Sequence, residues 1–156
     1  MPDQTRPDQT RPDQTRPDRT VPGSQGDVVL YVCTTCRAEG DSAEIRAGAR
    51  LRAALEARLA EAPVPGLRIE PVECLSVCRR PCTVAVASAG RWTYVYGDLD
   101  PAASAAALLD GIGLYAATPD GIVPWRARPE AFRKGVVARI PPFPPSVPPP
   151  IPEAAE

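Results

Sequence analysis

The fold is decided by one stretch of the chain, Asp27-Val28-Val29-Leu30-Tyr31-Val32-Cys33-Thr34-Thr35-Cys36. Its first half is a β-branched and aromatic run, which predicts a short buried strand. The strand ends at Cys33, and a second cysteine follows after two intervening residues. A strand that leads directly into a pair of thiols indicates both the architecture and the chemistry to look for in the rest of the chain.

The segments that follow predict a mixed sheet. They comprise a helix, a strand, a hairpin of two strands and a second helix. Their ranges are 41–60, 67–72, 83–87 with 91–96, and 101–110. A strand–helix–strand crossover implies a parallel pair, and a hairpin adds an antiparallel pair. We therefore expect an α/β domain with a mixed four-stranded sheet, βαβ then ββα, which is the plan of a thioredoxin-like domain.

The helix ends are predicted from local signals. Asp41, with Glu44 three residues later, is expected to cap the first helix. Asp100 followed by Pro101 is the start expected for the second helix, and Gly111 is its expected end. Asp98 and Asp100 are interpreted as turn and cap residues rather than catalytic acids.

Composition divides the chain into four parts. Residues 1–26 are a polar repeat that cannot bury enough apolar surface to order itself, so we expect a disordered tail. Residues 28–111 form the predicted domain, and residues 112–140 an extension packed on it. Residues 141–156 begin with eight prolines in the twelve positions from Pro141 to Pro152, which predicts an extended proline-rich tail.

Charge and hydropathy exclude several classes of function. Residues 28–140 carry 14 Lys and Arg against 12 Asp and Glu, so no basic field predicts nucleic-acid binding. No apolar run approaches 18 residues, and no signal-type segment precedes the first strand. We expect a cytoplasmic protein, where grouped cysteines more often serve metal or redox chemistry than disulfides.

Five cysteines fall in two clusters, and the chain contains no histidine. The first cluster is Cys33 with Cys36; the second holds Cys74, Cys78 and Cys82. A metal site built mainly from thiolate favours an iron–sulfur cluster, zinc or Cu(I). Both clusters follow predicted strands, and the sheet plan places the two loops at the same end. Four thiolates from two adjacent loops can surround one small cluster. A [2Fe–2S] centre needs four such ligands. Three arginines flank these cysteines and are expected to offset the negative charge of such a cluster: Arg37, Arg79 and Arg80.

The second cluster also carries a family resemblance. Val72-Glu73-Cys74-Leu75-Ser76-Val77-Cys78-Arg79-Arg80-Pro81 resembles the second cysteine loop of thioredoxin-like [2Fe–2S] ferredoxins, a group that includes the small subunit of respiratory NADH dehydrogenase. Tyr96-Gly97-Asp98-Leu99-Asp100-Pro101 is similar to the strand-to-helix corner of the same proteins. This resemblance covers about residues 28–110.

A narrower resemblance covers about residues 28–142. Cys33-Thr34-Thr35-Cys36-Arg37, Arg91-Trp92-Thr93-Tyr94, Pro119-Asp120-Gly121 and Pro124-Trp125-Arg126 are similar to a bacterial family of unknown function, whose members are usually described as predicted metal-binding proteins. The resemblance implies that the cluster ligands are Cys33, Cys36, Cys74 and Cys78.

Three alternatives stay open at this point. The gap between Cys33 and Cys36 is shorter than in the ferredoxin pattern, so Cys82 is the reserve ligand in place of Cys36. Four cysteines could instead hold zinc in a structural or interaction module. A Cys-X-X-Cys pair between a first strand and a first helix is also the position of a thioredoxin motif, which would make the protein a thiol–disulfide oxidoreductase.

The sequence therefore predicts a [2Fe–2S] ferredoxin-like carrier of one electron, and not an autonomous enzyme. No nucleophile–base pair and no glycine-rich phosphate loop is recognisable. The expected partner is another redox protein. Binding to nucleic acid or to a membrane is not expected, and a homodimer is left open. Four basic residues near the C-terminus are interpreted as solvated surface charge, with docking of an acidic redox partner as the alternative: Arg126, Arg128, Arg133 and Lys134.

Overall fold

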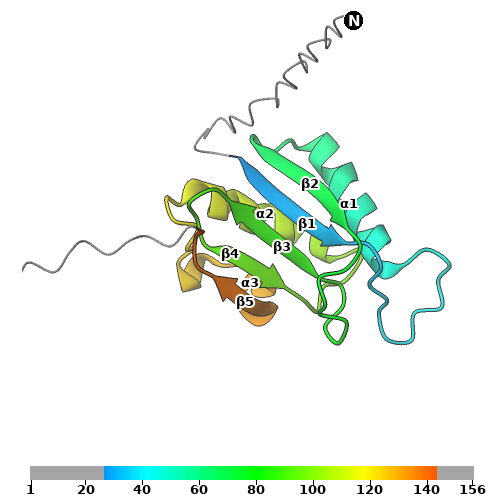
Figure 1. Cartoon of the computed structure of the whole chain (residues 1–156). Coiled ribbons are helices and arrows are strands. Elements are labelled where there is room, and N and C mark those ends of the chain that lie inside the picture. The colour runs from blue at the N-terminus through cyan, green and yellow to red at the C-terminus, as the bar shows by residue number, and fades with distance from the viewer. Residues whose placement is uncertain (1–26, 144–156) are drawn as a thin grey trace, which may run out of the picture.

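The computed structural model describes residues 27–143. The elements in chain order are β1 (Val28–Cys33), α1 (Ala47–Glu61), β2 (Leu67–Val72), β3 (Val84–Ser88), β4 (Thr93–Tyr96), α2 (Ser104–Ala117), the 3₁₀ turn η1 (Trp125–Ala127), α3 (Glu130–Lys134) and β5 (Val136–Ile140) (Figure 1). This order is βαβ, then a hairpin, then helix, as the sequence predicts. The predicted tails, 1–26 and the part of 141–156 after Phe143, lie outside the described residues.

The sheet is mixed and follows the order β2-β1-β3-β4-β5. β1 and β2 are parallel, with Val28 opposite Leu67 and Cys33 opposite Val72. β3 is antiparallel to β1, and β4 is antiparallel to β3. The expected thioredoxin-like plan is therefore confirmed. The expected strand count of four is wrong, because β5 pairs antiparallel with β4 and makes a fifth strand.

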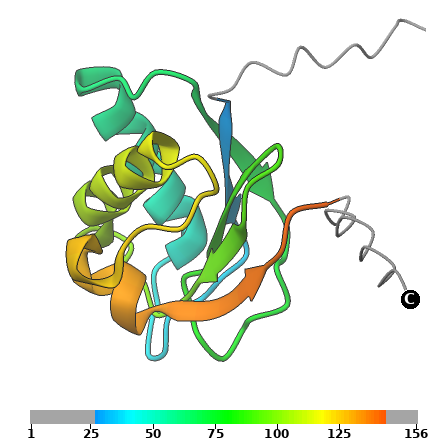
Figure 2. The ribbon, with the colours of Figure 1, turned by 90° about the vertical axis from the view of Figure 1, so that its left-hand side faces the viewer.

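The helices α1, α2 and α3 lie on one face of the sheet (Figure 2). β1 alternates between buried and half-buried residues until its end, as a strand with one covered face should. Its buried side chains belong to one core cluster with Leu51 and Leu55 of α1 and Leu108 of α2, all of which are fully buried. The core therefore lies between the helices and the sheet, and the strand ends that carry the cysteines are set on this rigid layer.

The helix α1 begins later than its predicted cap. It starts at Ala47, not at Asp41. The Asp41 carboxylate instead accepts a hydrogen bond from the backbone N–H of Ala43 and pairs with Arg50. The acid therefore closes a turn inside the loop that carries Cys36, because an aspartate can satisfy nearby N–H groups in a loop as well as at a helix end.

The helix α2 is longer than predicted, since it continues through Gly111 to Ala117. The boundary expected between residues 111 and 112 therefore falls inside this helix. A Cβ atom at Gly111 would lie 2.6 Å from the ring of Phe132 in α3. The glycine is needed for the close approach of another helix, rather than for a helix end.

The chain after α2 completes the sheet. Phe132 of α3 is buried and stacks on Tyr96 of β4, with ring centroids 4.1 Å apart. β5 then runs along β4, with Ile140 opposite Thr93. Residues 130–134 form the short helix α3. Within the described residues, no helix has the length and apolar character to cross a membrane.

Candidate cysteine centre

The cysteines lie on two loops at one end of the sheet. The first cysteine loop, residues 33–46, leaves the end of β1, and the second, residues 73–83, leaves the end of β2. Because β1 and β2 are parallel neighbours, both loops begin at the edge toward which the two arrows point (Figure 1). The predicted adjacency of the loops is confirmed, and they come from separate parts of the chain.

The two loops are joined by direct contacts at their roots. The Cys33 thiol lies 3.4 Å from the backbone carbonyl of Glu73, the residue before Cys74. The backbone N–H of Thr34 donates to the carbonyl of Val72 at 2.9 Å. The Thr35 hydroxyl donates to the same Glu73 carbonyl. Hydroxyl and amide donors of the first loop therefore satisfy the carbonyls that precede Cys74 and hold the loops together.

The thiols of Cys33 and Cys36 form a buried pair at the start of α1. Their exposed fractions are 3% and 7%. The backbone N–H of Gly48 donates to the carbonyl of Cys36 at 3.1 Å, and a Cβ on Gly48 would lie 2.0 Å from the Cys33 carbonyl oxygen. A glycine at this position lets the helix start directly against the cysteine pair.

The pKa values of the two thiols move in opposite directions. Burial raises the pKa of Cys33, but hydrogen bonds from Cys36 and from the backbone N–H groups of Leu75 and Thr35 outweigh burial and lower it. Burial, followed by the hydrogen bond to Cys33, raises the pKa of Cys36 to about 11. Cys33 is therefore the thiol of this pair that ionises first, and one donor that favours its thiolate comes from the second cysteine loop.

Cys82 belongs to the same buried core cluster as this pair. Its side chain is fully buried. Burial, followed by the charge of the nearby Cys36 thiolate, raises the pKa of its thiol to about 12. Its backbone N–H donates to the carbonyl of Leu99 at 3.2 Å. The structure therefore gives Cys82 the environment of a core residue beside Cys36.

Cys74 and Cys78 are exposed. The backbone N–H of Ser76 donates to the Cys74 sulfur at 3.2 Å, which is the way amides stabilise a sulfur that carries negative charge. Within residues 27–143, no three cysteine, histidine or acidic side chains are arranged as a metal site. The structure thus brings the two loops together, but not the four thiols into one coordination shell.

The cysteines fit a [2Fe–2S] cluster by their chemistry and because they lie on adjoining loops. Such a cluster takes four thiolates, and four cysteines on adjoining loops supply them from donors of one kind. Two of these cysteines are buried beside the contact between the loops and two are exposed beyond it. Because the thiols are not gathered, binding of such a cluster would require the thiols of the two loops to approach one another.

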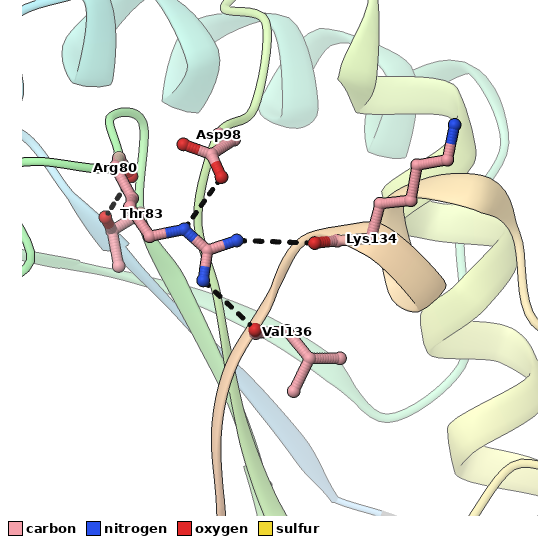
Figure 3. Close-up of polar contacts among 5 residues, drawn as sticks. All are labelled: Arg80, Thr83, Asp98, Lys134 and Val136. Carbon is pink, nitrogen blue, oxygen red and sulfur yellow. Dashed lines mark hydrogen bonds and ion pairs between the residues drawn. The ribbon is translucent and has the colours of Figure 1, made fainter.

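The three arginines beside the cysteines have different environments. Arg37 and Arg79 are exposed. Arg80 points away from its loop: its guanidinium pairs with Asp98 at 2.7 Å and donates to the carbonyls of Val136 at 3.1 Å and Lys134 at 3.3 Å (Figure 3). Arg80 therefore connects the second cysteine loop to α3 and β5.

Sequence reasoning missed the threonines that organise the centre. Thr34 and Thr35 hold the second loop, and hydrogen bonds with the backbone and side chain of Thr83 act on Cys36. Thr83 is fully buried, and its hydroxyl donates to the carbonyl of Arg80 at 3.0 Å. The sequence did offer one signal for Thr34 and Thr35, which is their position between two cysteines. It offered none for Thr83, because its contact with Cys36 forms only in the folded chain.

Fold and centre together define a thioredoxin-like domain with a cysteine-rich end. The chain belongs to the family described as protein of unknown function (DUF1636), whose profile matches residues 30–142. The predicted membership in a family of unknown function is thus confirmed, while metal binding stays a prediction. The comparison with curated proteins found no match.

Two solved structures resemble the chain. One is a thioredoxin-like [2Fe–2S] ferredoxin from Aquifex aeolicus, 15% identical, covering 81% of this chain and 98% of its own, with a TM-score of 0.48. The other is the wild-type form of a thioredoxin-like [2Fe–2S] ferredoxin from the same organism, 14% identical, covering 72% of this chain and 98% of its own, with a TM-score of 0.45.

Proposed function

We propose that this protein is a [2Fe–2S] ferredoxin-like carrier of one electron, with the cluster held by Cys33, Cys36, Cys74 and Cys78. One observation carries the proposal. The Cys33 sulfur touches the backbone of the second cysteine loop, 3.4 Å from the carbonyl that precedes Cys74. Thiols of two distant segments thus share one end of the sheet, which is the arrangement a four-thiolate cluster needs.

The residues of the chain have distinct tasks in this proposal. Cys33 ends β1, and Cys36 is held to the start of α1 through its carbonyl, which accepts a hydrogen bond from Gly48, so these two cysteines form the rigid half of the ligand set. Cys74 and Cys78 lie on an exposed turn and form the half that adapts when the cluster is assembled. Backbone N–H groups of Thr35, Leu75 and Ser76, which already act on cysteine sulfur, would stabilise the negative charge of the ligated sulfurs.

The cluster itself would supply the chemistry, which is the reversible uptake of one electron. The exposed turn matters for this activity because electron transfer requires a partner to approach closely. The protein would have no need of a nucleophile or a general base, in keeping with the sequence prediction that it is not an autonomous enzyme.

Metal content and colour test the proposal. Anaerobically purified full-length protein should be red-brown and should contain iron and acid-labile sulfide in equal amounts. Colourless protein with bound zinc would replace the proposal with a zinc-stabilised module. Cluster binding would be rejected if metal-free protein stayed colourless and took up no iron after iron and sulfide were supplied under reducing conditions.

A second candidate function rests on the thiol pair of the first loop. The hydrogen bond between Cys33 and Cys36 and their opposite pKa shifts are the features of a dithiol that attacks disulfides through its first cysteine. Metal-free protein with a reducible bond between these two cysteines, and with Cys74 and Cys78 dispensable for disulfide reduction, would favour this function over the ferredoxin.

A further inference from the structure

A basic surface lies beside the second cysteine loop. Residues 122–143 contain five basic residues and a single acidic one, in a chain whose formal net charge is −1. Three of the basic residues are exposed around η1 and α3: Arg126, Arg133 and Lys134. Among the described residues, neither Arg126 nor Arg133 forms an ion pair. Lys134 pairs with Glu130, so the charges that the described residues leave unpaired on this surface are those of Arg126 and Arg133.

The surface also has a hollow with an aromatic wall. An open cavity of about 380 Å³ is lined by Trp125, Glu130, Arg133 and Lys134. The Trp125 side chain is 60% exposed. The Arg128 guanidinium lies over the Trp125 ring, 5.6 Å from its centroid, and donates to the carbonyl of Val123, so a cation that is itself anchored packs against the indole. An indole that is exposed and yet held in place suits contact with another molecule.

The basic surface adjoins the proposed redox centre. Arg80, two residues after Cys78, donates to the backbone carbonyl of Lys134 (Figure 3). The backbone N–H of Gly97 donates to the carbonyl of Gly135 at 2.8 Å, which ties the end of α3 to the corner after β4. A protein seated on α3 would therefore also lie next to the exposed turn of Cys74 and Cys78.

We infer that the Trp125–α3 surface, formed by residues 125–134, docks an acidic face of the protein partner that exchanges electrons with the cysteine centre. Charge complementarity selects the partner, since the guanidinium groups of Arg126 and Arg133, which form no ion pair among the described residues, attract carboxylates and steer encounter. Trp and Arg are the residue types that contribute most to protein interfaces. This inference rests on the proposed function, because that function supplies the need for a redox partner.

Docking brings the partner close enough for one electron to pass from the cysteine centre to it. The reduced centre loses an electron and the partner gains it, with no bond formed or broken in either protein. The residues of the docking surface hold the partner against the second cysteine loop, and they take no part in the electron exchange itself. Their removal should therefore weaken encounter with an anionic partner and leave the centre intact.

Two matched charge variants of the full-length protein test the inference. The first, Arg133→Gln with Lys134→Gln, removes two cations and releases Glu130 from its ion pair. The control, Arg58→Gln with Arg68→Gln, also removes two cations and releases one carboxylate, that of Glu70. The control positions lie at the end of α1 and the start of β2, at the opposite end of the sheet from the cysteines.

The first measurement is the binding of a hexaglutamate peptide at low ionic strength. It is monitored through the NMR chemical shifts of the backbone amides. This readout does not depend on iron. We expect shifts at residues 125–134 in the parent, and an at least roughly threefold weaker affinity in the α3 variant, within the range of electrostatic steering. The control variant should bind like the parent. Equal binding by parent and α3 variant, or an equal loss in the control, overturns the inference.

The second measurement is the rate of oxidation of the dithionite-reduced protein by anionic ferricyanide and by cationic hexaammineruthenium(III). The α3 variant should react at least roughly threefold more slowly with ferricyanide, and no more slowly with the ruthenium complex. The difference should vanish at about 1 M salt, where charges are screened. Slowing by both oxidants overturns the inference, because it indicates damage to the centre rather than lost docking.

The two measurements separate the two hypotheses. Protein without iron that still binds hexaglutamate through α3 would remove the ferredoxin proposal and keep an acidic partner for this surface. Protein with the cluster but no α3-dependent binding would remove the docking surface alone. A dimer that the α3 variant converts to monomer would assign the surface to a second copy of the chain and overturn the acidic partner.

Discussion

The Cys33 sulfur lies 3.4 Å from the backbone carbonyl of Glu73, although the two residues are 40 positions apart in the chain. The parallel pairing of β1 with β2 produces this contact, because it ends both strands at the same edge of the sheet. Everything proposed for the cysteines depends on this juxtaposition. Without it, Cys33 and Cys74 would be two unrelated thiols.

Single replacements of the cysteines by serine should identify the ligands. We expect loss of iron and of the visible spectrum from the variants at Cys33, Cys36, Cys74 and Cys78. Cys82→Ser should keep both, because Cys82 is a fully buried core residue. Iron and sulfide analysis with visible absorption measures the outcome, and far-ultraviolet circular dichroism checks the fold. Bleaching by Cys82→Ser together with retention in Cys36→Ser would make Cys82 the fourth ligand.

Replacement of Arg80 should loosen the link between the second cysteine loop and β5. Arg80→Lys keeps the charge but cannot reach Asp98 and two carbonyls at once. The free energy of unfolding, measured by chemical denaturation, should fall by about 1–2 kcal/mol. Arg79→Lys, at an exposed neighbouring position, should change it by less than about 0.5 kcal/mol. Similar values for the two variants would contradict the bridging role of Arg80.

Two glycines of α2 should respond in opposite ways to alanine. At Gly111 the added Cβ would lie 2.6 Å from the Phe132 ring, so Gly111→Ala should destabilise the fold by about 1–3 kcal/mol. At Gly113 nothing lies within 4 Å of the added atom, so Gly113→Ala should stabilise the helix by about 0.5–1 kcal/mol. Thermal and chemical unfolding measure both, and a loss at both positions would show that helix α2 is packed differently.

The alkaline stability of the protein should depend on Tyr115. Burial raises the pKa of Tyr115 to about 12, whereas an unfolded tyrosine ionises near about pH 10. The folded state thus favours the neutral phenol, so its contribution is complete below about pH 10 and is lost as the pH rises toward 12. The phenol also donates to the Trp92 carbonyl at 2.8 Å.

Tyr115→Phe removes both effects. The variant should lose about 1 kcal/mol at about pH 8 through the missing hydrogen bond. Its free energy of unfolding should then fall less steeply than that of the parent between about pH 10 and about pH 12. Denaturation curves at several pH values measure this slope. Parallel curves for parent and variant would mean that the phenol of Tyr115 does not titrate differently in the folded chain.

Much of the fold could be predicted because its signals are local. The β-branched run before Cys33, the alternation at 67–72 and the turn at Ser88-Ala89-Gly90 specify strands and a hairpin from neighbouring residues alone. The cysteine clusters are equally local, and their position at strand ends follows from the same patterns. Confirmed on this basis were the order of the elements, the mixed sheet and the adjacency of the two cysteine loops.

Where the prediction was wrong, contacts distant in sequence were responsible. The local sequence predicts a helix end at Gly111. The glycine is instead required because the ring of Phe132, 21 positions later, packs against it. β5 is a short strand whose partner, β4, lies about 40 residues earlier. Asp41 has the spacing of a helix cap, yet its carboxylate serves a loop turn and Arg50.

The sequence by itself determined which groups are present and where each stands along the backbone, because turn residues, strand periodicity and cysteine spacing act over a few positions. Only the tertiary structure decided how deeply each thiol is buried. It also decided that Arg80 faces Lys134 and not a cysteine, and that the basic residues border the second cysteine loop. Burial and charge neighbourhood are properties of the packed chain, since they depend on which distant segments exclude water around each group.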